Sequence, residues 1–158
     1  MLYYPIKDIL HLRKMLSKSW EKETCAPNLR RKWSKRRKYV GQSDVTALVV
    51  NELYGGELMH YMVGKDDYYY NILDGLNIDL SLAADFQVVT GEETTREVML
   101  QDKDMNERYQ KLRKNIAHNV ELEQCQAVQQ LIDEFRERDK RYTRYLRKRN
   151  NRGGYPYV

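Results

Sequence analysis

The sequence has few of the residues that build a membrane span, a disulfide framework or a metal site. Its 158 residues include two cysteines, three histidines, three prolines and two phenylalanines. No stretch approaches the roughly 18 consecutive apolar residues of a membrane-spanning helix. The N-terminus has no basic stretch leading into an apolar run. We therefore expect neither a membrane span nor a signal peptide, and a cytoplasmic protein.

The cysteines and histidines show no pattern that would hold a ligand. Cys25 and Cys125 lie far apart in the chain. They could close one bridge, but reduced thiols are the simpler expectation in a cytosolic compartment. His11, His60 and His118 have no metal-ligand spacing to each other or to the cysteines. We expect no metal and no cofactor.

Basic side chains gather in two places. The formal charge of +5 comes from 28 Lys and Arg against 23 Asp and Glu. Seven of the eleven residues from 28 to 38 are basic, and nine more basic residues fall between 136 and 152. Such clusters indicate an acidic partner, of which phosphate is the commonest. The alternative interpretation is a solubilising loop and a solvated helix face.

Helical periodicity appears twice in the first third of the chain. Pro5 and Asp8 are expected to open a helix that continues to Trp20, and residues 21–41 to form a long connecting loop. Residues 43–53 are apolar nearly all round, which predicts a buried helix. We expect its first serine to serve as the N-cap and the glycine pair that follows to end it.

The middle of the chain predicts strands. Residues 57–63, 68–73 and 76–80 are β-prone, and Asp74–Gly75 between the last two is a strong signal for a hairpin turn. The chain is expected to become helical again from Thr94 onward.

The C-terminal third predicts a helical region. Asp104 with Glu107 fits an N-cap box, and apolar residues then recur at three- or four-residue steps as far as Leu146. The expected fold class is α+β, with a buried central helix on a small antiparallel sheet and a helical C-terminal region.

Several short motifs follow one another in a particular order along the chain. They are Ser19-Trp20, Gly41-Gln42-Ser43-Asp44-Val45-Thr46-Ala47-Leu48-Val49-Val50, Tyr54-Gly55-Gly56-Glu57-Leu58, Tyr68-Tyr69-Tyr70-Asn71, Asp74-Gly75, Ile78-Asp79-Leu80 and Asn106-Glu107-Arg108-Tyr109-Gln110-Lys111-Leu112. Their order and spacing resemble the YunG-like family of small bacterial proteins. The resemblance covers about residues 5–117 and predicts a domain over 1–117 with a basic helical extension over 118–158.

The resemblance implies a papain-like arrangement. In such folds a cysteine lies at the N-terminus of a buried helix, where the helix lowers the pKa of the thiol. A histidine and an acid come from adjacent strands; the histidine takes or holds the proton, and the acid orients the histidine ring. Those three positions are Ser43, Tyr68 and Asp79 here. A serine needs a base to become a nucleophile, and a tyrosine of pKa near 10 is protonated at neutral pH. We expect no enzyme activity; His60 is the alternative base for a residual Ser43-dependent hydrolase.

These observations predict a non-catalytic binding protein that engages nucleic acid or a nucleoprotein complex. An inhibitor of a host nuclease encoded by a phage or mobile element, of the anti-CRISPR type, would fit the small size. An acidic protein surface is the second candidate partner and an anionic membrane surface the third. Another alternative is an oligomerisation module whose C-terminal helix pairs with itself. The expected contact residues are Arg30, Arg31, Lys32, Trp33, Arg36, Arg37, Lys38, Arg138, Arg141, Tyr142, Arg144, Tyr145, Arg147, Lys148 and Arg149.

Overall fold

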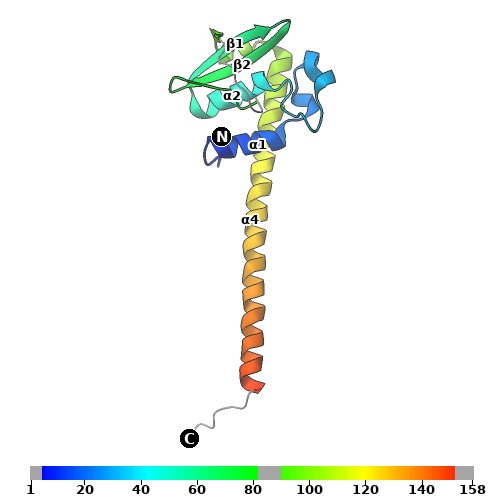
Figure 1. The fold of residues 1–158 in the computed structure, drawn as a ribbon, viewed down its shortest axis with the longest axis vertical. Helices are drawn as coiled ribbons and strands as arrows, with labels where there is room; N and C mark the ends of the chain where they lie inside the picture. The colour runs from blue at the N-terminus through cyan, green and yellow to red at the C-terminus, as the bar shows by residue number, and fades with distance from the viewer. Residues whose placement is uncertain (1–4, 82–89, 152–158) are drawn as a thin grey trace. The chain divides into compact units, whose positions relative to one another are not determined.

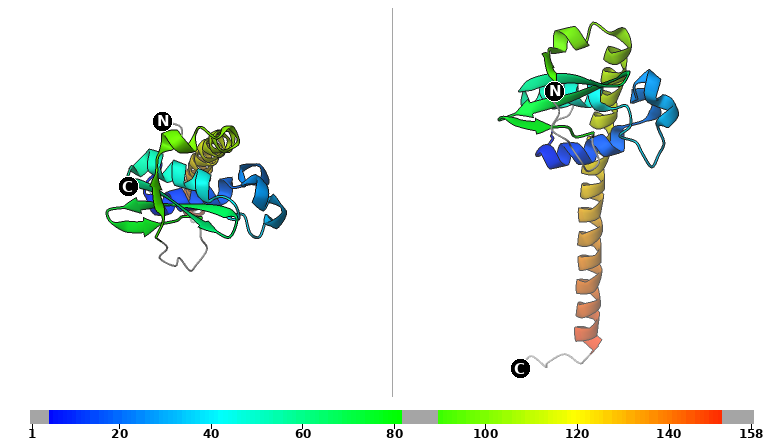
Figure 2. Two further views of the ribbon diagram at one scale, coloured as in Figure 1. Left: turned by 90° about the horizontal axis from the view of Figure 1, so that it is seen from above. Right: turned by 45° about the horizontal axis from the view of Figure 1, so that its top comes forward.

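A computed structural model describes residues 5–81 and 90–151. The chain divides into two compact units, residues 1–120 and 121–158. The first holds the sheet and most of the helices (Figures 1 and 2). The fold is α+β, with a small antiparallel sheet and a long C-terminal helix, as predicted. Among the described residues, no helix has the length and apolarity to cross a bilayer.

The first predicted helix is confirmed as α1 (Ile9–Ser19). The Asp8 carboxylate caps it by accepting a hydrogen bond from the amide of His11 at 2.8 Å. The helix therefore begins at the cap, and Pro5 lies outside it. Leu12, Met15 and Leu16 are fully buried on its inner face.

The segment after α1 is more regular than the expected loop. It contains two 3₁₀ helices, η1 (Lys22–Thr24) and η2 (Pro27–Lys32). Pro27 begins η2, where its fixed φ suits the first helical position and its missing N–H costs no hydrogen bond. The prediction of one long irregular connection was therefore wrong in part.

The buried helix is confirmed as α2 (Ser43–Tyr54), whose first eight residues are all buried. Gly55 ends it with φ at +70°, a conformation that glycine adopts without strain. The N-cap is Gln42, so the expectation that Ser43 caps this helix was wrong. Ser43 is its first helical residue, and its hydroxyl bonds to a neighbouring strand.

In the described residues, the sheet has four strands in the order β3-β2-β1-β4, and every pair is antiparallel. Its strands are β1 (Glu57–Val63), β2 (Asp66–Leu73), β3 (Leu76–Ile78) and β4 (Glu92–Thr94). The predicted hairpin is confirmed, with φ at +50° for Asp74 and +76° for Gly75, as a primed turn requires. The predicted third strand ends two residues early. The β4 strand was not predicted, because three residues show no alternation.

The helix α2 links the sheet to α1. On its sheet side, the Asn71 side-chain amide donates to the Ala47 carbonyl at 3.0 Å. Towards α1, the indole of Trp20 donates to the Thr46 hydroxyl at 3.0 Å. The helices α1, α2 and the first turns of α4 bury one shared apolar cluster.

The short α3 (Arg96–Met99) precedes α4 (Lys103–Asn151). Asp102 caps α4 by accepting from the amide of Met105 at 2.9 Å. The predicted cap box at Asp104 was therefore wrong by two residues. Asp104 instead accepts a hydrogen bond from the Arg108 guanidinium.

A buried ion pair joins α4 to the N-terminus of α2. Arg108 and Asp44 form a bidentate contact of 3.0 and 2.7 Å, and their side chains are 6% and 8% exposed. Arg108 also donates to Asp104 at 2.6 Å and to the Thr24 carbonyl at 3.4 Å. Burial by itself lowers the pKa of Arg108, but the hydrogen bonds and charges of Asp44 and Asp104 raise it above its ordinary value. Arg108 therefore stays charged throughout the stable pH range.

A second polar network holds the same two helices together further along. The Tyr109 hydroxyl donates to Glu52 and accepts from Arg96 at 2.7 Å. Arg113 also pairs with Glu52, at 2.8 Å. Two residues that carry the family resemblance, Arg108 and Tyr109, are therefore buried structural groups.

Replacing Arg108 by methionine should lower the free energy of unfolding by about 3–5 kcal/mol, because Asp44 would remain charged and buried without a partner. The double variant Arg108→Met/Asp44→Leu should recover much of that loss, since neither buried charge remains. Urea unfolding measures both. Lys103→Met, which removes an exposed pair with Glu107, is the matched control and should change little. A single variant no less stable than the control would show that the pair does not hold the fold.

Candidate functional site

Ser43 is used as a structural contact between α2 and the sheet. Its side chain lies at the first turn of α2, and the residue is 8% exposed. Its hydroxyl oxygen accepts a hydrogen bond from the backbone amide of Tyr69 at 3.2 Å. A serine nucleophile needs a base that takes its proton. This hydroxyl meets a backbone donor instead.

Tyr68 lies on the face of the sheet opposite to the α2 side. Its ring stacks on Tyr61, with 5.6 Å between the ring centroids. Burial, and then the charge of Asp66, raises the pKa of Tyr68 above its ordinary value. Tyr69, the next residue, points to the α2 side, where burial and then the carboxylates of Asp67 and Asp44 raise its pKa to about 12.

Asp79 lies on the same side of the sheet as Tyr68, away from Ser43. Its carboxylate accepts from the Ser81 amide at 2.8 Å. Burial, and then the charge of Asp79, raises the pKa of Tyr61. Successive strand residues point to opposite faces, so Tyr68 and Asp79 gather around Tyr61 while Ser43 lies behind the strand. The three positions do not form one reacting group.

His60 has a different partner from the one that a hydrolase would need. Its Nε2 lies 2.7 Å from an Asp67 carboxylate oxygen, across the β1–β2 pair. Its ring lies 4.8 Å from that of Tyr69. Among the described residues, no hydrogen bond joins His60 to Ser43.

Neither cysteine offers a buried thiolate. Both are free thiols: Cys25 is buried and Cys125 exposed. Burial raises the pKa of Cys25 to about 11, and the nearby charges of Arg108 and Arg30 offset this only in part. A Cβ at residue 41 would come within 2.4 Å of the Cys25 sulfur, so only glycine fits beside it. In the described ranges, no three His, Cys, Asp or Glu side chains form a possible metal cluster.

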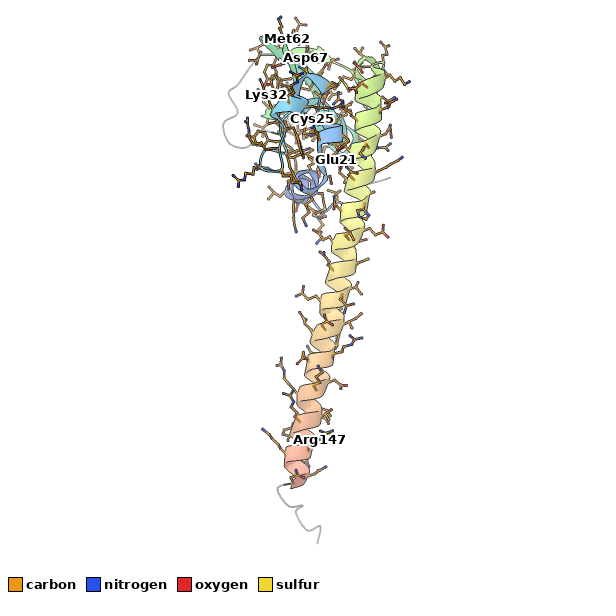
Figure 3. The ribbon with its side chains drawn as sticks, turned by 90° about the vertical axis from the view of Figure 1, so that its right-hand side faces the viewer. Glu21, Cys25, Lys32, Met62, Asp67 and Arg147 are labelled. Carbon is orange, nitrogen blue, oxygen red and sulfur yellow. The ribbon has the colours of Figure 1, made fainter. Side chains whose placement is uncertain are left out.

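The first basic cluster, residues 30–38, is called here the basic segment. The Arg30 side chain already has partners within the first unit. It donates to the Cys25 carbonyl at 3.3 Å and lies 3.9 Å from an Asp104 carboxylate oxygen. Trp33 is half-buried and donates to the Lys38 carbonyl at 3.1 Å, which folds the segment back on itself. The exposed cations, including Lys32 in Figure 3, are Arg31, Lys32, Lys35, Arg36 and Arg37.

A groove of 540 Å³ opens beside the basic segment, entirely within the first unit. Cations, two indole rings and side-chain amides line it. Asn115 and Asn119 of α4 both donate to Ser19, at 3.0 and 2.9 Å, and so hold α4 against the end of α1. The lining residues are Lys18, Ser19, Trp20, Glu21, Trp33, Lys35, Lys38, Asn115, His118 and Asn119.

Sequence reasoning found Trp33 and Lys38 but missed Lys18, Asn115 and His118 as site residues. These three come from α1 and α4, far from the basic segment in the chain. The one local signal is Lys18, a basic residue in the last turn of α1.

The second basic cluster lies on the part of α4 that belongs to the second unit. Its predicted contact residues are all exposed, from Arg138 to Arg149. Arg138 lies over the ring of Phe135 at 5.2 Å, and Arg147 lies near the end of the helix (Figure 3). The two basic clusters therefore belong to different units.

We expect one reactive thiol in the folded chain. At pH 7.5 iodoacetamide should alkylate Cys125 and leave Cys25 unmodified, because a thiol of pKa about 11 forms almost no thiolate there. Peptide mass spectrometry measures the modified sites. Modification of Cys25 should appear only as the pH approaches 11 or after unfolding, and Cys125→Ser should abolish labelling at pH 7.5. Rapid labelling of Cys25 in the folded chain at that pH would contradict the assignment.

The chain is similar to known proteins over its first unit. The YunG protein family matches residues 8–121. The YunG protein of Bacillus subtilis (strain 168) is 28% identical over 71 residues, which are 45% of this chain and 57% of that protein. The chain thus spans less than two thirds of that relative's length. No solved structure matches. Because the family match covers well over half of the chain, the protein belongs to the YunG family.

Proposed function

We propose that this chain is a non-catalytic binding protein, built on a degenerate papain-like arrangement, which engages the phosphate groups of a nucleic acid or a nucleoprotein complex. The observation that carries the proposal is the groove in the first unit. The cations Lys18, Lys35 and Lys38 line this groove together with the indole of Trp33.

The papain-like part of the proposal rests on α2 and the sheet. A buried helix packs on antiparallel strands, and its first residue is Ser43, the position that the family resemblance assigns to the cysteine. Among the described residues, the Ser43 hydroxyl has no hydrogen bond to a basic side chain, and Tyr68 carries a raised pKa on the other face. The helix-on-sheet packing supports the proposed scaffold, and the separation of Ser43 and Tyr68 on opposite sides of β2 supports the proposed loss of catalysis.

The phosphate part rests on the composition of the groove. Lysine ammonium groups bind phosphate as point charges, and aromatic rings give bases a stacking surface. Glu21 is the one acid among the lining residues, and Lys111 lies 3.1 Å from its carboxylate. The exposed arginines of the basic segment extend the positive surface beyond the groove.

The second unit offers further phosphate contacts. Arg144 and Arg147 are exposed, and neither forms an ion pair among the described residues. They can add affinity without sequence specificity, as phosphate contacts do.

A nucleoprotein is the second form of partner in this proposal. An inhibitor of a host nuclease, of the anti-CRISPR type, would place the same cations against the exposed nucleic acid of the complex. Such an inhibitor should form a complex of fixed stoichiometry with the nuclease and its bound nucleic acid, which size-exclusion chromatography would detect.

The alternative of a residual hydrolase predicts a labelled serine. A fluorophosphonate probe should leave the folded chain unmodified, because in the part of the chain that the structure describes the Ser43 hydroxyl has no hydrogen bond to a basic side chain. In-gel fluorescence measures the labelling, with an active serine hydrolase in the same tube as the positive control. Labelling that disappears in Ser43→Ala would overturn the non-catalytic assignment.

Nucleic-acid binding should be strongly salt-dependent. Fluorescence anisotropy with labelled duplex DNA, single-stranded DNA and RNA, between about 50 and 200 mM salt, should show binding that weakens steeply as phosphate counterions are released. In the full chain, replacing Lys35, Arg36 and Arg37 together by glutamine should weaken binding about tenfold or more. It should also lower the salt slope on duplex DNA by about 0.9 for each lost contact.

The matched control removes the same charge elsewhere on the first unit. Lys7, Lys65 and Lys103, all exposed, replaced together by glutamine should change affinity by less than about twofold, since only the long-range field changes. A third variant, Arg144→Gln/Arg147→Gln, reports the share of the second unit. Equal losses of affinity in the first variant and its control, or no binding at low salt, would contradict the proposal that nucleic acid is the partner.

A further inference from the structure

We infer that the second unit is a dimerisation element, in which residues 121–151 of α4 pair antiparallel with the same segment of a second copy. This inference is independent of the proposed phosphate site, which lies in the first unit. Two features of the described helix carry it: an exposed apolar stripe and a separation of charge along the helix.

An apolar stripe runs along this part of α4 at coiled-coil spacing. Val128, Phe135 and Tyr142 recur every seven residues, and Leu131 and Tyr145 each follow by three. In the described residues 121–151 these side chains are 52–60% exposed. Isolated helices are only marginally stable in water, and most gain their stability by packing an apolar face. The stripe therefore lacks the partner that a helix of this kind packs against.

The charge changes sign halfway along the same segment. Between residues 121 and 137 there are five acids and one base, whereas between 138 and 149 there are seven bases and one acid. A parallel pair would place like charges together along its whole length. An antiparallel pair places the acidic half of each helix against the basic half of the other. Charge complementarity therefore favours a second copy of this chain, in the antiparallel orientation, as the partner of the apolar stripe.

The stripe is consistent with this orientation. When Phe135 lies opposite Arg138 of the second copy, Leu131 meets Tyr142 and Val128 meets Tyr145. The contact repeats by symmetry on both sides of its centre, as a two-fold interface requires. From residue 128 to residue 145 it extends over about 26 Å at about 1.5 Å per residue.

The residues beside the stripe pair by charge in this register. Glu134 precedes Phe135 and comes beside Arg141 of the second copy, so two such pairs flank the centre. Arg144 and Arg147 fall on the outer side of the helix and remain free for other contacts. The proposed dimer would therefore leave the outer arginines available for phosphate.

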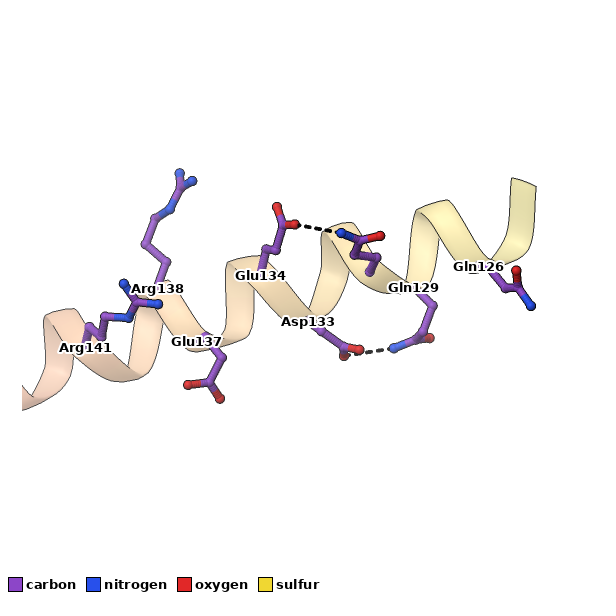
Figure 4. Close-up of a pocket in the computed structure, with 8 residues that line it drawn as sticks. Gln126, Gln129, Asp133, Glu134, Glu137, Arg138 and Arg141 are labelled. Carbon is purple, nitrogen blue, oxygen red and sulfur yellow. Dashed lines mark hydrogen bonds between the residues drawn. The ribbon is translucent and has the colours of Figure 1, made fainter. Parts of the chain in front are cut away.

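A hollow of 720 Å³ lies along one side of this helix, at the point where acids give way to bases (Figure 4). It runs from Gln126 to Arg141, and every lining residue belongs to α4. Asp133 and Glu134 accept hydrogen bonds from Gln129 and Gln130, at 3.0 and 3.3 Å, which keep both carboxylates along the helix. By helical spacing, Gln126, Gln129, Asp133 and Glu137 fall on the outer side of the helix, the side of Arg144 and Arg147. This hollow therefore stays outside the proposed pair.

Sedimentation equilibrium of the full chain should give a particle of twice the 19.0 kDa chain mass that dissociates on dilution. Phe135→Gln should raise the dissociation constant at least about tenfold, because it removes the apolar side chain nearest the centre of the pair, which lies opposite Arg138 of the second copy. Thr143→Gln, an exposed change on the outer side of the same helix, should leave the constant unchanged. A monomer at all concentrations, or equal effects of the two variants, would overturn the inference.

The charge pairs test the orientation. Glu134→Arg alone should weaken the dimer, because it faces Arg141 with a like charge. The swap Glu134→Arg/Arg141→Glu should restore it. The two positions are too far apart along one helix to interact within a chain. A swap that is as weak as the single variant would overturn the antiparallel register.

Cys125 provides a second readout of orientation. In the antiparallel register it lies beside residue 146 of the second copy and far from the other Cys125. A short bismaleimide should therefore leave the native chain uncrosslinked and join two chains of Leu146→Cys, seen as a doubled mass on a denaturing gel. Cross-linking of the native chain as fast as of the variant would show a parallel pair and overturn the inference.

Discussion

The bidentate contact between Arg108 and Asp44 is the interaction on which the first unit depends. It joins the first turns of α4 to the N-terminus of α2, and Arg108 also donates to the Thr24 carbonyl at the end of η1. Taking two charges out of water costs several kcal/mol each unless their hydrogen bonds are made. The pair therefore stabilises one arrangement of these three segments, and that arrangement places the walls of the groove.

Most of the polar side chains near the N-terminus of α2 are likewise used in structural hydrogen bonds. Gln42 is fully buried and its side-chain amide donates to the Glu21 carbonyl at 2.9 Å. The Ser43 hydroxyl accepts a hydrogen bond from β2, and Arg108 and Tyr109 form buried contacts with α2. The polar residues that carry the family resemblance are thus largely occupied in holding helices and strands together. Charged groups available to a partner lie instead on the basic segment, the groove and the exposed part of α4.

Local patterns predicted the elements whose signals are local. Asp8 caps α1, Gly55 ends α2, and Asp74–Gly75 turns the hairpin, because capping and positive φ are decided within a few residues. The short β4 was not predicted from the sequence, because its pairing with β1 depends on residues that are distant in the chain. The cap of α4 was misplaced because Asp104 has a better partner in Arg108, which no N-cap pattern reveals.

The sequence by itself determined the α+β class, the hairpin, the family resemblance and the two basic clusters, since each follows from periodicity, turn chemistry or composition. Tertiary structure decided that Ser43 and Tyr68 lie on opposite sides of the sheet. Alternation along β2 shows which residues share a face, but only the packing of α2 decides which of the two faces it covers. Tertiary structure also decided that Lys18, Trp33 and His118 share one groove. Those residues come from three distant segments, and only the packing of α1 and α4 around a common core brings them together.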